Sequence, residues 1–85
     1  MAEEKQIGRI VHYFGKISVG IIGLTDTLKV GDTIHIKGHS EDFTQTIESM
    51  QIEHAIVNEA KAGDDVGIKV EHQVHVNDVV YKVIA

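Results

Sequence analysis

Two stretches with the same beginning decide the fold: LKVGDTIHIKG, Leu28 to Gly38, and KAGDDVGIKV, Lys61 to Val70. Each places glycine and aspartate, which tight turns favour, directly before a run in which apolar and polar residues alternate. Such alternation is typical of a strand with one buried face. In the first stretch we expect Ile34 and Ile36 to point inward and His35 to point outward. The pair of stretches therefore predicts two strands, each delivered by a turn.

The rest of the chain follows the same period of two, in residues 7–14, 17–22, 43–54 and 79–84. No segment of ten or more residues keeps a helical period, and proline is absent. These features predict an all-β protein of six or seven short strands. Because closing a small sheet removes its exposed edges, we expect a small closed antiparallel β-barrel. Residues 1–6 are polar and are expected to form a flexible tail, leaving residues 7–85 as a single domain.

Some details of the pattern carry their own expectations. The first strand places Ile7, Arg9, Val11 and Tyr13 on one face, and Ile10 and Phe14 on the other. In residues 43–54 the apolar positions change from odd to even numbers, which indicates a bulge near Glu48 and Ser49. Residues 56–62 are compatible with a helical turn or with a connecting loop.

The composition excludes several classes of protein. The chain has 85 residues, with thirteen acidic and eight basic residues and a formal charge of −5, which argues against indiscriminate binding of nucleic acids. It has no cysteine, so disulfides, thiolate metal sites and a thiol nucleophile are excluded. The N-terminal MAEEKQ lacks the apolar centre of a signal peptide, and no apolar run is long enough to span a bilayer. A cytoplasmic protein without membrane contact is expected.

Four landmarks in order resemble one family: residues 28–36, 49–51, 60–68 and 78–80. They are similar to the second, β-barrel domain of translational GTPases such as elongation factor Tu, and most of all to small stand-alone translation elongation factor-like proteins. The resemblance covers about residues 7–83 and implies a barrel of the translation-factor domain 2 type. In that family the barrel contacts ribosomal RNA, and in some members it holds the charged end of a tRNA.

The chain departs from the family pattern in three places. Asn77 stands where the family has glycine, an exchange that a turn tolerates because Asn also accepts a positive φ. The first hairpin, around Gly15, matches only loosely. The GTPase domain is missing and no G-x-x-x-x-G-K-[ST] loop occurs, so no GTP binding is expected.

The resemblance implies a binding surface rather than a catalytic centre. It places residues 51–54 in the stretch that contributes to the tRNA pocket. Outward basic residues and neighbouring aromatic rings could form a strip that binds single-stranded RNA by stacking, although outward lysines also simply keep strands soluble. The candidate contact residues for RNA or a protein partner are Arg9, Tyr13, Lys16, Lys37, Gln51, His54 and Lys69.

The six histidines and the serines raise the questions of a metal site and of catalysis. His72 and His75 are three residues apart, a spacing that puts side chains on opposite faces of a strand. We therefore expect solvated imidazoles, no metal and no cofactor. The serines lack a G-x-S-x-G context, and the acidic pairs at residues 41–42 and 64–65 lie in expected turns, where acids cap and solvate. No enzymatic activity and no catalytic residue are expected.

The favoured interpretation is a non-enzymatic, translation-factor-like binding module. Its partner would be ribosomal RNA, tRNA or a translation-associated protein. The alternative is a protein-interaction adaptor without a nucleic-acid ligand, marked by an exposed apolar patch. A metal-binding module that uses histidines is a weaker third possibility.

Overall fold

The computed structural model describes residues 3–84, and all its regular elements are strands, so the prediction of an all-β fold is confirmed. The strands are β1 (Glu4–Phe14), β2 (Val19–Leu24), β3 (Leu28–Lys29), β4 (Thr33–Lys37), β5 (Asp42–Thr46), β6 (Met50–Ile52), β7 (Ala55–Val57), β8 (Glu59–Ala60), β9 (Asp65–Lys69) and β10 (Val79–Val83). Within the described range no helix is long and apolar enough to cross a membrane.

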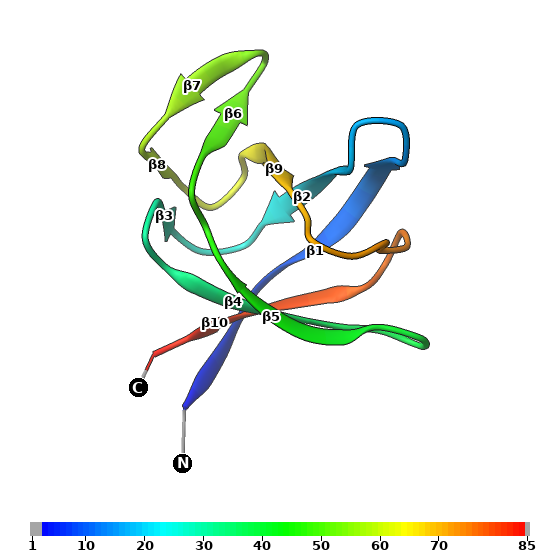
Figure 1. Ribbon diagram of the computed structural model, residues 1–85. Coiled ribbons are helices and arrows are strands. Elements are labelled where there is room, and N and C mark those ends of the chain that lie inside the picture. The colour runs from blue at the N-terminus through cyan, green and yellow to red at the C-terminus, as the bar shows by residue number, and fades with distance from the viewer. Residues whose placement is uncertain (1–2, 85) are drawn as a thin grey trace.

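Eight strands form one antiparallel sheet in the order β5-β4-β10-β1-β2-β9-β6-β7, and β3 pairs with β8 in a small second sheet. The large sheet bends around a shared interior (Figure 1). The expected closed barrel was wrong, because β5 and β7 are the end strands of the sheet and no ladder joins them in the described residues. Between β5 and β6 the chain leaves the strand conformation at residues 47–49.

A side chain bridges the gap between β5 and the end of β9. The amide nitrogen of Gln45 donates a hydrogen bond to the carbonyl oxygen of Lys69 at 2.9 Å. The amide oxygen of Gln45 accepts one from the backbone N–H of Glu71, also at 2.9 Å. Gln45 thus occupies the place of a neighbouring strand and satisfies two backbone groups that a closed ladder would have paired.

Three turns of the same design precede β4, β9 and β10, at residues 29–32, 61–64 and 75–78. In each turn the aspartate at the fourth position accepts a hydrogen bond from the backbone N–H of the first residue at 2.9 Å. The third position has a positive φ: 96° at Gly31, 95° at Gly63 and 78° at Asn77. The expectation that Asn77 accepts a positive φ is therefore confirmed. The Gly-Asp pattern of the sequence encodes this turn.

The interior is filled by aliphatic side chains from most of the strands. The expected inward positions Ile34 and Ile36 are buried, and so are the alternating residues Val66 and Ile68 of the second stretch. The buried hydrophobic residues are Ile7, Ile10, Ile22, Leu24, Leu28, Ile34, Ile36, Ile47, Met50, Ala60, Val66, Ile68, Val70, Val74 and Val80.

The expected faces of the first strand were wrong. Ile7 and Ile10 are both buried, although a regular strand would put them on opposite faces. The register shift between Gln6 and Gly8 in the pairing with β10 explains this, and a second shift follows between Ile10 and His12 in the pairing with β2. Each shift inserts one residue and reverses the face that follows.

Three further expectations concern the boundaries of the strands. A bulge was expected near Glu48 and Ser49; instead, residues 47–49 lie outside any strand and separate β5 from β6. Residues 56–62 contribute to β7 and β8 rather than to a helical turn. Strand β1 begins at Glu4, inside the expected tail, because its backbone pairs with β10 from Glu4 onward. Residues 1 and 2 of that tail lie outside the described part of the chain.

Candidate functional site

The outer surface of the sheet carries a row of residues that crosses five strands. Directly opposed residues of neighbouring antiparallel strands lie on the same face of a sheet. The pairings align His12 of β1, Ile21 of β2, Gly67 of β9, Gln51 of β6 and Ile56 of β7. Because the neighbouring residue Ile22 is fully buried, this row lies on the side that faces away from the interior. Ile56 is 76% exposed.

A second row adds apolar surface to the first. Phe14 pairs with Val19, which pairs with Lys69, so these three side chains share the outer surface. Phe14 is 50% exposed, and its ring stacks on that of His12 with 6.3 Å between the ring centroids. We call the surface formed by His12, Phe14, Val19, Ile21, Gly67 and Ile56 the outer face.

Two glycines, Gly67 and Gly23, let neighbouring aliphatic side chains pack directly over the backbone of this part of the sheet. A Cβ at Gly67 would lie 3.2 Å from Cδ1 of Ile21, and a Cβ at Gly23 would lie 3.1 Å from Cγ1 of Val11. The side chains of Ile21 and Val11 therefore lie over glycine backbone, where a larger residue would clash with them. The result is an apolar strip with charged residues at its margins.

The structure brings some of the predicted contact residues together on this surface. Lys69 and Gln51 lie in its two rows, and Arg9 lies in the next row, paired with Gly23. Lys16, in the turn after β1, and His54, in the turn between β6 and β7, are both exposed, but the pairings of β2, β9 and β6 put these turns at opposite ends of the strands.

The other two predicted contact residues lie elsewhere. Lys37 is at the end of β4, paired with Val79 and Asp42 in a different part of the sheet. Tyr13 is opposite the buried Gly20 and packs against the core. The expected basic and aromatic strip is therefore divided between separate parts of the molecule.

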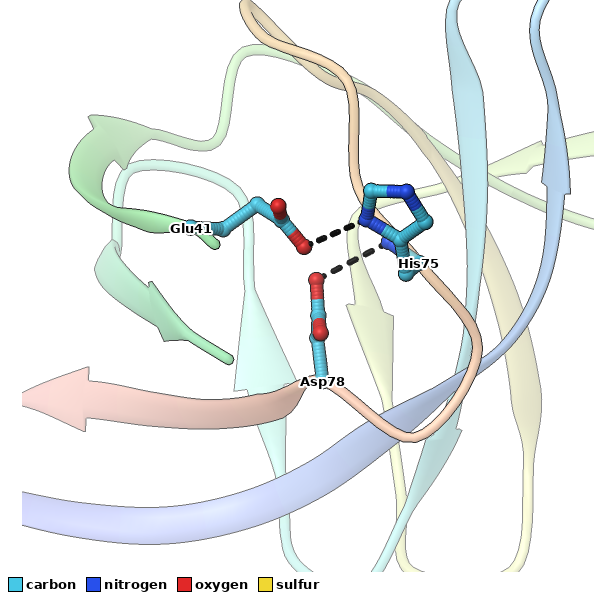
Figure 2. Close-up of side chains that lie close together, drawn as sticks. All are labelled: Glu41, His75 and Asp78. Carbon is cyan, nitrogen blue, oxygen red and sulfur yellow. Dashed lines mark hydrogen bonds and ion pairs between the residues drawn. The ribbon is translucent and has the colours of Figure 1, made fainter. Parts of the chain in front are cut away.

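A second candidate site joins the β4–β5 loop to the third turn. Nδ1 of His75 donates a hydrogen bond to Oε1 of Glu41 at 2.7 Å, and the backbone N–H of His75 donates to Oδ2 of Asp78 (Figure 2). One potential ligand atom from each of the three side chains lies within 4.8 Å of the others. We call Glu41, His75 and Asp78 the carboxylate–histidine cluster. Both acids are more than nine-tenths buried, whereas the His75 side chain is 57% exposed.

The pKa values of the two acids of the cluster are shifted in opposite directions. Hydrogen bonds from Asp78 and then from His75 lower the pKa of Glu41. Burial, and then the hydrogen bond to Glu41, raises the pKa of Asp78. Two buried carboxylates cannot both ionise cheaply at this separation, so the pKa of Asp78 moves up while that of Glu41 moves down. The hydrogen bond to Glu41 raises the pKa of His75.

Sequence reasoning missed this cluster because its members come from two distant turns. The histidine spacing paired His75 with His72, but the His72 ring packs edge-on against Phe43, with 4.8 Å between the ring centroids. His72 and Phe43 line a surface hollow of about 290 Å³. The available signal was the third turn itself, which begins with His75 where the other two turns begin with lysine.

A groove of about 640 Å³ follows the gap that Gln45 bridges. It is lined by Ser18, Gln45, Thr46, Ile47, Glu48, Ser49, Ile68, Lys69, Val70 and Glu71. Its lining contains two serines and no histidine.

Comparisons with known proteins relate the chain to a different group from the one expected. No family model matches the sequence. Over 77 residues, 89% of the chain, it is 44% identical to the "Uncharacterized protease MJ0090" of Methanocaldococcus jannaschii. This match covers 19% of the protease, so the chain spans about a fifth of the length of that relative.

Two solved structures have a similar fold. One is the C-terminal domain of a Geobacillus thermoleovorans putative U32 peptidase, with a TM-score of 0.86 and 21% identity over 92% of this chain and 91% of that one. Its selenomethionine variant has a TM-score of 0.85 and 20% identity over 89% of this chain and 96% of that one. This chain has the fold of that C-terminal domain.

These findings overturn the expected relationship to domain 2 of translation factors. The expected function as a translation-factor-like module was also wrong, and with it the reason to expect RNA as the ligand. The error has a physical cause. The landmarks at residues 28–36, 60–68 and 78–80 are turn-and-strand units, and any small β-domain that starts a strand from such a turn can show them.

Proposed function

We propose that this chain is a non-catalytic accessory domain that docks on the catalytic part of a peptidase of the U32 type. The observation that carries the proposal is the 44% identity to one stretch of a protease about five times as long. In that relative the matching stretch is covalently attached to the rest of a protease chain. The fold of a putative U32 peptidase's C-terminal domain supports the same role.

The outer face is the proposed docking surface. Its apolar residues come from β1, β2 and β7, and Gly67 of β9 lies between them, so a partner can approach closely. A protein–protein interface typically has an apolar centre and a polar rim. Arg9 and Lys69 lie at the margins of this surface and would supply charged contacts at the rim.

A role without catalysis is supported by the surroundings of the polar side chains. Ser18 and Ser49 line a groove without a histidine. In the carboxylate–histidine cluster, His75 contacts two acids and not a hydroxyl nucleophile. The proposed contribution of the chain is therefore to position a polypeptide or a catalytic domain.

The test uses the Methanocaldococcus jannaschii protease from which the stretch that matches this chain has been deleted. Calorimetry should detect saturable one-to-one binding of the chain to this shortened protease. Phe14→Glu and Ile56→Glu, both exposed in the free chain, should each weaken binding at least tenfold. Val30→Lys, an exposed apolar residue of the first turn, is the matched control and should leave the affinity unchanged. Equal binding by all four proteins would exclude the outer face.

A further inference from the structure

The carboxylate–histidine cluster has an unusual balance of charge. Glu41 and Asp78 are both more than nine-tenths buried, and a carboxylate oxygen of one lies within 4.8 Å of a carboxylate oxygen of the other. Among residues 3–84, the only cationic group within ion-pair distance of either carboxylate is the imidazole of His75. Buried acids of like charge are costly unless a proton or another cation lies between them. The cluster is therefore suited to take up positive charge.

We propose that Glu41, His75 and Asp78 bind a divalent transition-metal ion of the zinc class. Imidazole nitrogen with carboxylate oxygen is a donor set that zinc uses in proteins, at about 2.0–2.2 Å from each ligand atom. Two ligands of one ion are thus at most about 4.4 Å apart. The three candidate atoms already lie within 4.8 Å of one another, so small side-chain rotations suffice.

The backbone holds the ligands in place before an ion arrives. The third turn fixes Asp78 through the hydrogen bond from the backbone N–H of His75. The carboxylate of Asp78 occupies space next to Gly38 that any β-carbon there would fill. Glu41 enters from the same loop as Gly38, whose N–H donates to the carbonyl oxygen of Glu41 at 2.8 Å. Exposure of His75 leaves room for water to complete the coordination of the ion.

The other two turns provide an internal comparison. Asp32 and Asp64 occupy the same position as Asp78, but their turns begin with Lys29 and Lys61. A lysine supplies a positive charge and no ligand for a metal at neutral pH. Only the third turn combines an imidazole at the first position with a second carboxylate, that of Glu41, beside it.

This comparison gives the test a well-matched variant. His75→Lys makes the third turn like the first two, so it should keep the fold while it removes the ligand. The wild-type chain is titrated with zinc chloride by calorimetry, and with magnesium chloride in parallel. We expect one zinc ion per chain, at least tenfold tighter binding than that of magnesium, and a zinc-dependent rise in the melting temperature. His75→Lys and Glu41→Gln should each weaken zinc binding at least tenfold.

His72→Gln is the control for zinc held by other surface imidazoles, and it should bind zinc like the wild type. Circular dichroism of each variant without metal checks that the fold is retained. The ring resonances of His75 should also shift on addition of zinc before those of the other histidines. The proposal is overturned if the wild type binds no zinc. It is equally overturned if His75→Lys retains the wild-type affinity. Neither outcome bears on docking through the outer face.

Discussion

The carboxylate of Asp78 lies against the α-carbon of Gly38, in the space that a β-carbon at this position would occupy. This contact joins the β4–β5 loop to the third turn, two segments that are far apart in the sequence. Asp78 cannot easily move aside, because its other oxygen accepts the backbone N–H of His75. The absence of a side chain at Gly38 is thus a structural requirement of the carboxylate–histidine cluster.

Replacement of Gly38 by alanine should therefore destabilise the protein by steric overlap. We expect Gly38→Ala to lower the free energy of unfolding by about 1–3 kcal/mol, the usual range for overpacking. Gly15→Ala is the control, since its β-carbon would lie 3.5 Å from the Tyr13 ring, an ordinary contact. Urea denaturation measures both variants. Equal stability of the two would mean that Asp78 does not occupy this space in solution.

At Gly31 and Gly63 glycine is required for a different reason, namely the positive φ of the backbone. Nothing lies within 4 Å of a β-carbon built at either residue, yet both have a φ near +95°. Alanine in this region costs about 1–2 kcal/mol. We expect Gly31→Ala and Gly63→Ala each to lower the free energy of unfolding by that amount. Asn77→Gly should be neutral or slightly stabilising, and a destabilised Asn77→Gly variant would contradict the common turn design.

The bridge at Gln45 should contribute measurably to stability. Gln45→Leu keeps most of the side-chain volume but leaves the Glu71 N–H and the Lys69 carbonyl without their partner. An unsatisfied buried polar group costs about 1–3 kcal/mol. We expect a loss of at least about 1 kcal/mol and faster hydrogen exchange of the Glu71 amide. Gln51→Leu, the same change on the outer surface, serves as the control and should alter neither quantity much.

His35 should make stability depend on pH. Its Nδ1 contacts Oε2 of Glu4 at 2.8 Å, and its Nε2 contacts Oδ1 of Asp42, so both ring nitrogens donate only when the imidazole is protonated. The hydrogen bond to Asp42 raises the pKa of His35 above its ordinary value of 6.5; burial opposes this effect and Glu4 adds to it. Its contribution to stability is complete below pH 6.5 and is lost as the pH rises through the folded pKa.

The measurement is the free energy of unfolding as a function of pH from 6 upward. The wild type should lose stability with rising pH, and His35→Gln should show a shallower dependence. His75 acts in the same direction, because Glu41 raises the pKa of its imidazole as well. Titration of each imidazole by NMR separates the two contributions. A His35 resonance that titrates below pH 6.5 would contradict the bridging geometry.

Much of the fold could be predicted from local pattern. Alternation placed Ile34, Ile36, Val66 and Ile68 in the core, and the Gly-Asp signals marked the turns that precede their strands. These features depend on residues within a few positions of one another. The faces of β1 could not be predicted in this way, because its two register shifts arise from pairing with β10 and β2.

The candidate sites depend on contacts between distant segments, which a single sequence does not encode in an obvious way. In the sequence, Gln45 is one polar residue of an expected strand. Its hydrogen bonds to the backbone of Lys69 and Glu71 can be recognised only once the position of β9 is known. Glu41 and His75 are 34 residues apart in the sequence and meet only in the fold. The outer face likewise follows from the register of β1, β2, β9, β6 and β7.

The most direct test of the accessory-domain account is an NMR spectrum of the chain with labelled isoleucine and valine methyl groups. It is recorded with and without the shortened Methanocaldococcus jannaschii protease. We expect the methyl resonances of Val19, Ile21 and Ile56 to shift or broaden, while those of Val30 and Val76 remain in place. Unchanged spectra, or shifts centred on Val30 and Val76, would contradict docking of a peptidase on the outer face.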